Sequence, residues 1–147
     1  MPRVLVLNGP NLGRLGSREP DVYGAQDLSA LRVLLVEQAG SAVEIDLRQT
    51  DDEAELIHWL YEAVDTTTPV ILNPAAFTHY SYAIRDAISA VRLPTIEVHL
   101  SNIHGRDEFR RHSVIAPVVS GQIAGLGARG YLLALEAAKD IVEQSHR

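Results

Sequence analysis

A loop rich in hydrogen-bond donors follows the first apolar run of the chain. Beyond Val4 to Leu7, residues 8–24 are punctuated by glycine and proline and carry Arg18 and Tyr23. Connections in compact α/β domains usually run about 2–6 residues, so a polar loop of roughly 15 is typical of a lid or binding loop. A guanidinium beside a phenol favours the phenolate, a usable general base, although an isolated Arg–Tyr pair is more often a surface stack.

Glu97 and His99 form a second candidate pair. They alternate with apolar residues in the run from Thr95 to Leu100. Residues two apart in a strand project to the same face, so the carboxylate lies within reach of the imidazole. The pair is either a buried structural hydrogen bond or an oriented imidazole that acts as a general acid or base.

Polar side chains also follow another apolar run, Val70 to Leu72. Asn73 begins a turn with Pro74, and His79 comes shortly after it. Each has a structural alternative, because Asn-Pro is a common turn, a lone histidine is more often a surface or capping residue, and the nearby Thr78 and Ser81 can cap a helix. A basic cluster comes later, at Arg106, Arg110 and Arg111.

The elements that must position these residues follow from the apolar pattern. Strands are expected at Val4–Leu7, Val43–Leu47, Val70–Leu72, Thr95–Leu100 and Val118–Ile123. Apolar residues at helical spacing occur in the segments between these strands and again over Tyr131–Glu143, where helices are expected. This alternation predicts a three-layer, doubly wound α/β fold with a parallel sheet of five strands. Ligands of such sheets bind at the carboxyl ends of the strands, where the polar segments above could meet.

Composition narrows the class of protein. The 147 residues predict one catalytic domain over residues 1–147. A net charge of −6 argues against a nucleic-acid partner, and no apolar run is long enough for a membrane span or a signal peptide. The chain has no cysteine, which makes a cytoplasmic location the expectation. Its one lysine, Lys139, lies in the expected last helix, an unpromising place for an imine.

Other functional templates fit poorly. Gly125, Gly127 and Gly130 match G-x-G-x-x-G, but too few residues follow for the acidic position of a dinucleotide site. These glycines are interpreted as close packing between a strand and a helix. No Walker sequence, G-x-S-x-G elbow or H-E-x-x-H occurs. A metal on His99, His104 and His112 is disfavoured, because no cysteine or suitably spaced carboxylate completes the set.

Five separated motifs together point to one family. They are Asn8-Gly9-Pro10-Asn11-Leu12, the segment from Leu15-Gly16 through Arg18-Glu19-Pro20 to Tyr23-Gly24, residues 73–79, residues 96–102 and residues 109–113. In this order they resemble the type II 3-dehydroquinate dehydratases, over Val4 to about Leu135. Gly13-Arg14 and Ala75 depart from the common pattern, in which Asn-Leu and Gly are frequent.

The resemblance implies a flavodoxin-like fold and dehydration of 3-dehydroquinate to 3-dehydroshikimate, in the shikimate pathway of aromatic amino acid biosynthesis or in quinate breakdown. It implies an anti elimination through an enolate without metal, imine or cofactor. Matched residues give Tyr23 as the base, Arg18 as its stabiliser, Asn11 as the holder of a water at the enolate oxygen, and His99, positioned by Glu97, as the acid. Substrate would be held by Asn73, His79, Asp86, Leu100, Ser101 and Arg110, with Arg14 and Arg106 belonging to the lid.

The resemblance also implies a homo-oligomer, a dodecamer built from trimers, in which Asp86 reaches a neighbour's site. An alternative from another class is a flavodoxin-like nucleotide or flavin binding or signalling domain without turnover. That alternative would need an aromatic or phosphate-binding loop, and the chain offers only Trp59 on an expected helix and no Ser/Thr-rich loop. Neither membrane nor nucleic acid is expected as a partner.

Overall fold

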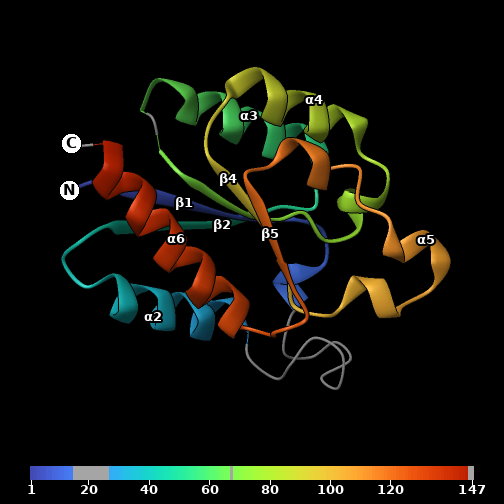
Figure 1. The fold of residues 1–147 in the computed structure, drawn as a ribbon, viewed down its shortest axis with the longest axis horizontal. Coiled ribbons are helices and arrows are strands. Elements are labelled where there is room, and N and C mark those ends of the chain that lie inside the picture. Colours follow the sequence, from blue (N-terminus) through green and yellow to red (C-terminus); the bar gives the residue numbers. More distant parts are fainter. Residues whose placement is uncertain (15–26, 67, 146–147) are drawn as a thin grey trace.

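A five-stranded parallel sheet forms the centre of the computed structural model, which describes residues 1–14, 27–66 and 68–145 (Figure 1). The sheet has the order β2-β1-β3-β4-β5. Its strands are β1 (Arg3–Asn8), β2 (Glu44–Gln49), β3 (Val70–Asn73), β4 (Thr95–His99) and β5 (Gly121–Ala124). The expected doubly wound α/β fold, with this flavodoxin-like strand order, is confirmed.

Helices cover both faces of this sheet. On one face lie α2 (Leu28–Ala39) and α6 (Arg129–Ser145), and on the other lie α3 (Glu53–Ala63) and α4 (Tyr82–Val91) (Figure 1). Three of the helices begin at a side chain that accepts a backbone N–H, namely Asp27, Asp52 and Ser81. A short helix, α5 (Glu108–Arg111), was not expected, since four residues carry no helical period.

The core is divided between the two faces because side chains alternate along a strand. In β1, Val4 and Val6 pack toward α2 and α6, whereas Leu5 and Leu7 pack toward α3 and α4. All four side chains are fully or almost fully buried. A central parallel strand is covered on both faces, which is why it is continuously apolar in the sequence.

The chain reverses direction across the sheet after β2. It leaves β1 for β2 at one edge and then crosses back to place β3 on the other side of β1. The carboxyl ends of β1 and β3 therefore lead to helices on opposite faces of the sheet, α2 and α4, and a crevice opens at that edge of the sheet. Asn8 and Asn73 stand opposite each other at this point.

The predicted strand Val118–Ile123 is wrong at its start. Residues Ala116–Val118 form a 3₁₀ turn containing Pro117, and β5 begins only at Gly121. The Ser113 hydroxyl binds the N–H groups of Ile115 and Ala116 and sets this turn, which overrides the strand preference of the valines. The other strand limits move by one or two residues.

Gly130 packs closely against the sheet as predicted. An added Cβ there would lie 3.3 Å from Ile123 and 3.5 Å from Val98. Gly125 and Gly127 instead have φ of 90° and 60°, conformations that favour glycine in the turn before α6. No helix within the described ranges is both long and apolar enough to cross a membrane.

Candidate active site

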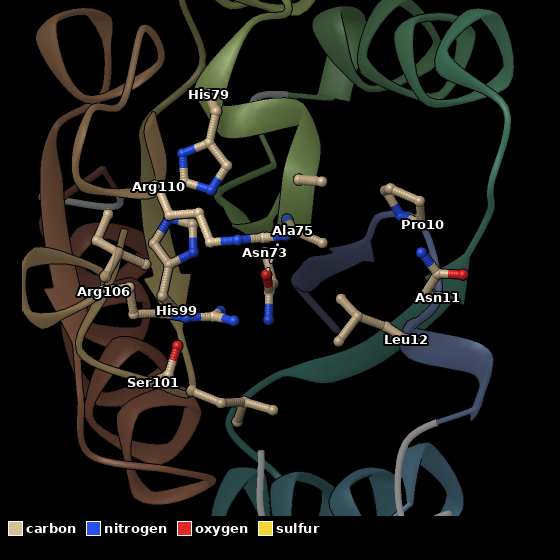
Figure 2. Close-up of a pocket in the computed structure, with 13 residues that line it drawn as sticks. Pro10, Asn11, Leu12, Asn73, Ala75, His79, His99, Ser101, Arg106 and Arg110 are labelled. Carbon is tan, nitrogen blue, oxygen red and sulfur yellow. Dashed lines mark hydrogen bonds between the residues drawn. The ribbon is translucent and has the colours of Figure 1, made fainter. Parts of the chain in front are cut away.

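A pocket opens at the carboxyl ends of β1, β3 and β4. Figure 2 shows His79, His99, Arg106 and Arg110 along one wall, with Asn11 across from them and Asn73 between. The described residues that line it include two arginines and two histidines but no carboxylate. A chain of net charge −6 thus presents a cationic pocket, which suits an anionic ligand.

The loop after β1 is held close to the loop after β3. The Gly9 N–H donates to the carbonyl of Asn73 at 2.8 Å, and a Cβ on Gly9 would lie only 2.5 Å from the Pro74 carbonyl oxygen. Only glycine permits this approach. Asn11 follows with φ of 68°, which asparagine tolerates, and its N–H donates to Asp51 at 2.8 Å.

A buried tyrosine fixes the side chain of Asn73 at the pocket floor. The Tyr131 hydroxyl donates to Asn8 at 2.7 Å and accepts from the Asn73 amide at 2.8 Å. The Asn73 carbonyl oxygen accepts the N–H of Ala75, whose φ is 52°. Burial raises the pKa of the Tyr131 phenol, so this hydroxyl stays protonated. The amide of Asn73 therefore has one orientation.

Glu97 and His99 are hydrogen bonded, as the sequence predicted. His99 Nε2 lies 2.5 Å from Glu97 Oε2, and both side chains are buried. Burial alone would raise the pKa of the Glu97 carboxyl. Hydrogen bonds from His99, Thr78 and Gln122 and the charge of His99 outweigh burial, and the pKa falls below its ordinary value of 4.5. Glu97 is thus an anion at neutral pH.

His79 faces the same pocket as a neutral ring. Its Nδ1 donates to the carbonyl of His112 at 2.8 Å, which leaves Nε2 as the acceptor in the neutral form. Burial lowers the pKa of His79 below 6.5; the bond to His112 opposes this, and positive charge on His99, Arg110 and Arg106 lowers it further. A neutral acceptor that shares the pocket with Arg110 and Arg106 is suited to a ligand hydroxyl.

Most of the predicted site residues in the described part of the chain meet here. The pocket is lined by Asn11, Asn73, His79, His99, Leu100, Ser101, Arg106 and Arg110, with Glu97 directly beneath His99. Arg14 lies in a 3₁₀ turn just after β1 and is not among the lining residues, and Asp86 is exposed on α4, also outside this pocket. Tyr23 and Arg18 lie outside the described residues.

The sequence did not single out several polar groups that support the site. Thr78, read as a possible helix cap, instead donates to Glu97 at 2.7 Å, while Ser81 is the cap of α4. Ser113 and Gln122 also donate to Glu97, at 2.9 and 3.1 Å. Asn8 and Tyr131 were missed as well. Asn8 and Gln122 are polar residues inside otherwise apolar runs, and Asn8, Thr78 and Ser113 also belong to the motifs of the family resemblance, which could have drawn attention to them.

The chain is similar to known proteins over nearly its whole length. Residues 2–139 match the family model described as dehydroquinase class II. A 3-dehydroquinate dehydratase of Pelotomaculum thermopropionicum is 56% identical over 137 residues, covering 92% of this chain and 95% of the relative. A 3-dehydroquinate dehydratase of Salinispora tropica is 57% identical over 135 residues, covering 90% of this chain and 94% of the relative.

Solved structures agree with the sequence relatives. The crystal structure of a type II dehydroquinase from Propionibacterium acnes superposes with a TM-score of 0.92 at 48% identity, and the match covers 95% of this chain and 97% of that one. A type II dehydroquinase from Butyrivibrio crossotus superposes with a TM-score of 0.90 at 42% identity, and the match covers 93% of this chain and 97% of that one.

Proposed function

We propose a reaction on the premise that the chain belongs to the dehydroquinase class II family and is an enzyme of that family. The enzyme converts 3-dehydroquinate to 3-dehydroshikimate and water. The reaction is an anti elimination through an enolate, without a metal or an imine. Residues 1–147 act as one catalytic domain in the cytoplasm, in the shikimate pathway or in quinate breakdown. Family membership does not favour a flavin or nucleotide carrier.

The first step is removal of a proton from C2, next to the ketone. This proton is weakly acidic, so the reaction needs a strong base beside a group that stabilises the enolate. In our proposal the Tyr23 phenolate takes the proton, and Arg18 stabilises the phenolate and the developing charge. The C–H electron pair becomes the enolate, whose oxygen is solvated by a water that Asn11 holds.

The second step expels the C1 hydroxyl. The enolate collapses, the C1–C2 double bond forms and the C1–O bond breaks, while His99 gives the departing oxygen a proton so that it leaves as water. Hydroxide is a poor leaving group, which makes this proton transfer necessary. The carboxylate of Glu97 supports the step by holding the ring of His99 and balancing its charge.

Binding of the substrate is assigned to the remaining pocket groups. Arg110 and the Leu100–Ser101 segment hold the substrate carboxylate and ring hydroxyls together with Asn73, and neutral His79 accepts from a hydroxyl. Arg106 belongs to the electrostatics of the lid, together with Arg14. Asp86, exposed on α4, reaches the site of a neighbouring subunit.

The observation that carries this proposal is the convergence of the Glu97–His99 pair with Asn11 and two arginines in one pocket, in a chain of this family. The direct test is incubation with 3-dehydroquinate while the ultraviolet absorbance of the product enone is followed. A steady rise in absorbance is expected. A purified, folded protein that produces no enone with this substrate would refute the proposed reaction.

We expect activity to survive both EDTA and borohydride added with substrate. The only lysine in the sequence, Lys139, bonds to the Gln38 carbonyl and Glu136 and does not line the pocket, so no imine is expected. Initial rates before and after each treatment provide the measurement. Inactivation by borohydride would point to an imine on Lys139, and loss with EDTA would point to a metal.

We expect a large assembly in solution, a dodecamer built from trimers, with Asp86 completing a neighbour's site. Asp86→Ala is then expected to reduce activity although Asp86 does not line the pocket of its own chain. Light scattering at micromolar concentration measures the assembly, and mixing Asp86→Ala with His99→Gln tests for shared sites. A fully active monomer would contradict both statements.

A further inference from the structure

Four hydrogen-bond donors surround one oxygen of the Glu97 carboxylate. Oε2 accepts from His99 Nε2 at 2.5 Å, Thr78 Oγ1 at 2.7 Å, Ser113 Oγ at 2.9 Å and Gln122 Nε2 at 3.1 Å. Glu97 itself has no exposed surface. Of the residues in this cluster, the proposed reaction uses only His99 and Glu97, so it gives the other three donors no role.

The backbone fixes the direction of the Ser113 hydroxyl. Its oxygen accepts the N–H groups of Ile115 at 3.2 Å and Ala116 at 3.0 Å. A hydroxyl has two acceptor lone pairs and one hydrogen. Both lone pairs are therefore occupied, and the hydrogen of Ser113 points toward Glu97 or Thr78.

The direction of the Thr78 hydroxyl follows from that of Ser113. Thr78 Oγ1 lies 2.7 Å from Ser113 Oγ and 2.7 Å from Glu97 Oε2. Because Ser113 has no lone pair left to accept, the hydrogen of Thr78 goes to Glu97. The amide of Gln122 likewise donates through Nε2. Oε2 of Glu97 thus meets only donors, and a proton placed on this oxygen would face one of their hydrogens; Oε1 has a longer contact with Ser113 Oγ, at 3.3 Å.

We propose that Thr78, Ser113 and Gln122 are positioning residues that keep Glu97 an acceptor of hydrogen bonds and never a donor. Nε2 of His99 then always carries a hydrogen, which it donates to Glu97. The proton that His99 transfers in the reaction therefore sits on the other ring nitrogen, Nδ1. Within the described residues, Nδ1 has no hydrogen-bond partner. His99 lines the pocket, where Nδ1 is the nitrogen left to meet a ligand. The catalytic part of this inference rests on the proposed function.

The charges around His99 explain why such a device is needed. Arg106, Arg110 and His79 share the pocket with it, so His99 lies in a cationic environment. Glu97 on the same strand is the one carboxylate within the described part of the chain that bonds to the ring. If Glu97 took the proton from Nε2 of the imidazolium, the carboxylate would no longer be a counterion, and the ring would be left neutral with its hydrogen on Nδ1, a weaker acid than the imidazolium.

Two nearly isosteric variants test the proposal, because each removes one donor. Thr78→Val deletes a hydroxyl and Gln122→Met deletes an amide, whereas Thr78→Ser keeps the donor. Thr95→Val is the matched control: it removes a buried threonine hydroxyl from the same strand as Glu97, and that hydroxyl donates to the Leu93 carbonyl instead. Gln122 is exposed on an edge strand, so its variant is expected to fold even if Thr78→Val does not.

The first measurement is ¹⁵N NMR of His99 in the substrate-free enzyme. At a pH where the His99 ring is neutral, the unmodified protein should show hydrogen on Nε2 only, and Thr78→Val combined with Gln122→Met should show a mixture with hydrogen on Nδ1. In the dehydration assay each single variant should lose about tenfold in kcat, with KM within about twofold. Thr78→Ser and Thr95→Val should behave as the unmodified protein.

The two readouts separate the inference from the proposed function. A tautomer that stays on Nε2 in the double variant overturns the inference, whatever the activity. A tautomer that shifts in a protein with no dehydratase activity supports the proton placement and refutes the proposed reaction. An equal loss of kcat in Thr95→Val would also count against the inference, because the effect would then be structural.

Discussion

Tyr23→Phe is expected to lower kcat for dehydration by at least 100-fold while KM changes little. General acid–base groups typically contribute about 10² to 10⁴-fold, and the hydroxyl of Tyr23 is the proposed base. The loss falls on kcat because this hydroxyl acts on the transition state more than on the bound substrate. Steady-state kinetics over a range of pH measure both parameters.

Controls for this prediction come from another tyrosine and from Arg18. Tyr61→Phe on α3 removes a phenol hydroxyl from an exposed side chain and should leave kcat unchanged. Arg18→Ala should lower kcat by a similar factor. In the pH profile, the limb that follows ionisation of the base should shift to higher pH, because the phenolate loses its neighbouring cation. A Tyr23→Phe enzyme that keeps more than about a tenth of the original kcat would rule out this base.

The apolar pattern predicts the sheet well because burial on both faces leaves a direct trace in the sequence. Val70–Leu72 is continuously apolar and forms β3 up to its last residue, Asn73, and helices cover this strand on both sides. The start of β5 could not be predicted in this way. Val118 and Val119 have strand preferences, but a turn set by the Ser113 hydroxyl and Pro117 takes precedence.

The location of the pocket could also be predicted, since it depends on one rule about parallel sheets. Asn11, Asn73 and His99 come at or just after the carboxyl ends of three different strands and meet in one crevice. The Glu97–His99 contact needed only the two-residue repeat of a strand.

The polar groups beneath the pocket could not be predicted, because tertiary packing alone brings them together. Tyr131 meets Asn8 across 123 residues of sequence, and Gln122 meets Glu97 across 25. Neither separation has a period that a single sequence reveals. Thr78 illustrates the difficulty: its place before a helix favours a capping role, and only the packing of β4 against the preceding turn gives it a different partner.

His99→Gln is expected to lower kcat by about 10² to 10⁴-fold and to separate the two chemical steps. Glutamine can still hydrogen bond to Glu97 but cannot give the departing hydroxyl a proton at neutral pH. The base is intact in this variant, so the C2 proton should still be removed and returned. In deuterated water the variant should therefore incorporate deuterium at C2 of 3-dehydroquinate much faster than it forms the enone.

Mass spectrometry of the recovered substrate measures this exchange, and an incubation without enzyme supplies the background rate. Tyr23→Phe provides the opposite pattern, because without the base neither exchange nor elimination should exceed that background. If His99→Gln loses exchange and elimination to the same extent, His99 acts before or during removal of the C2 proton. The assignment of Tyr23 to the first step and His99 to the second would then be wrong, even if both residues are needed for activity.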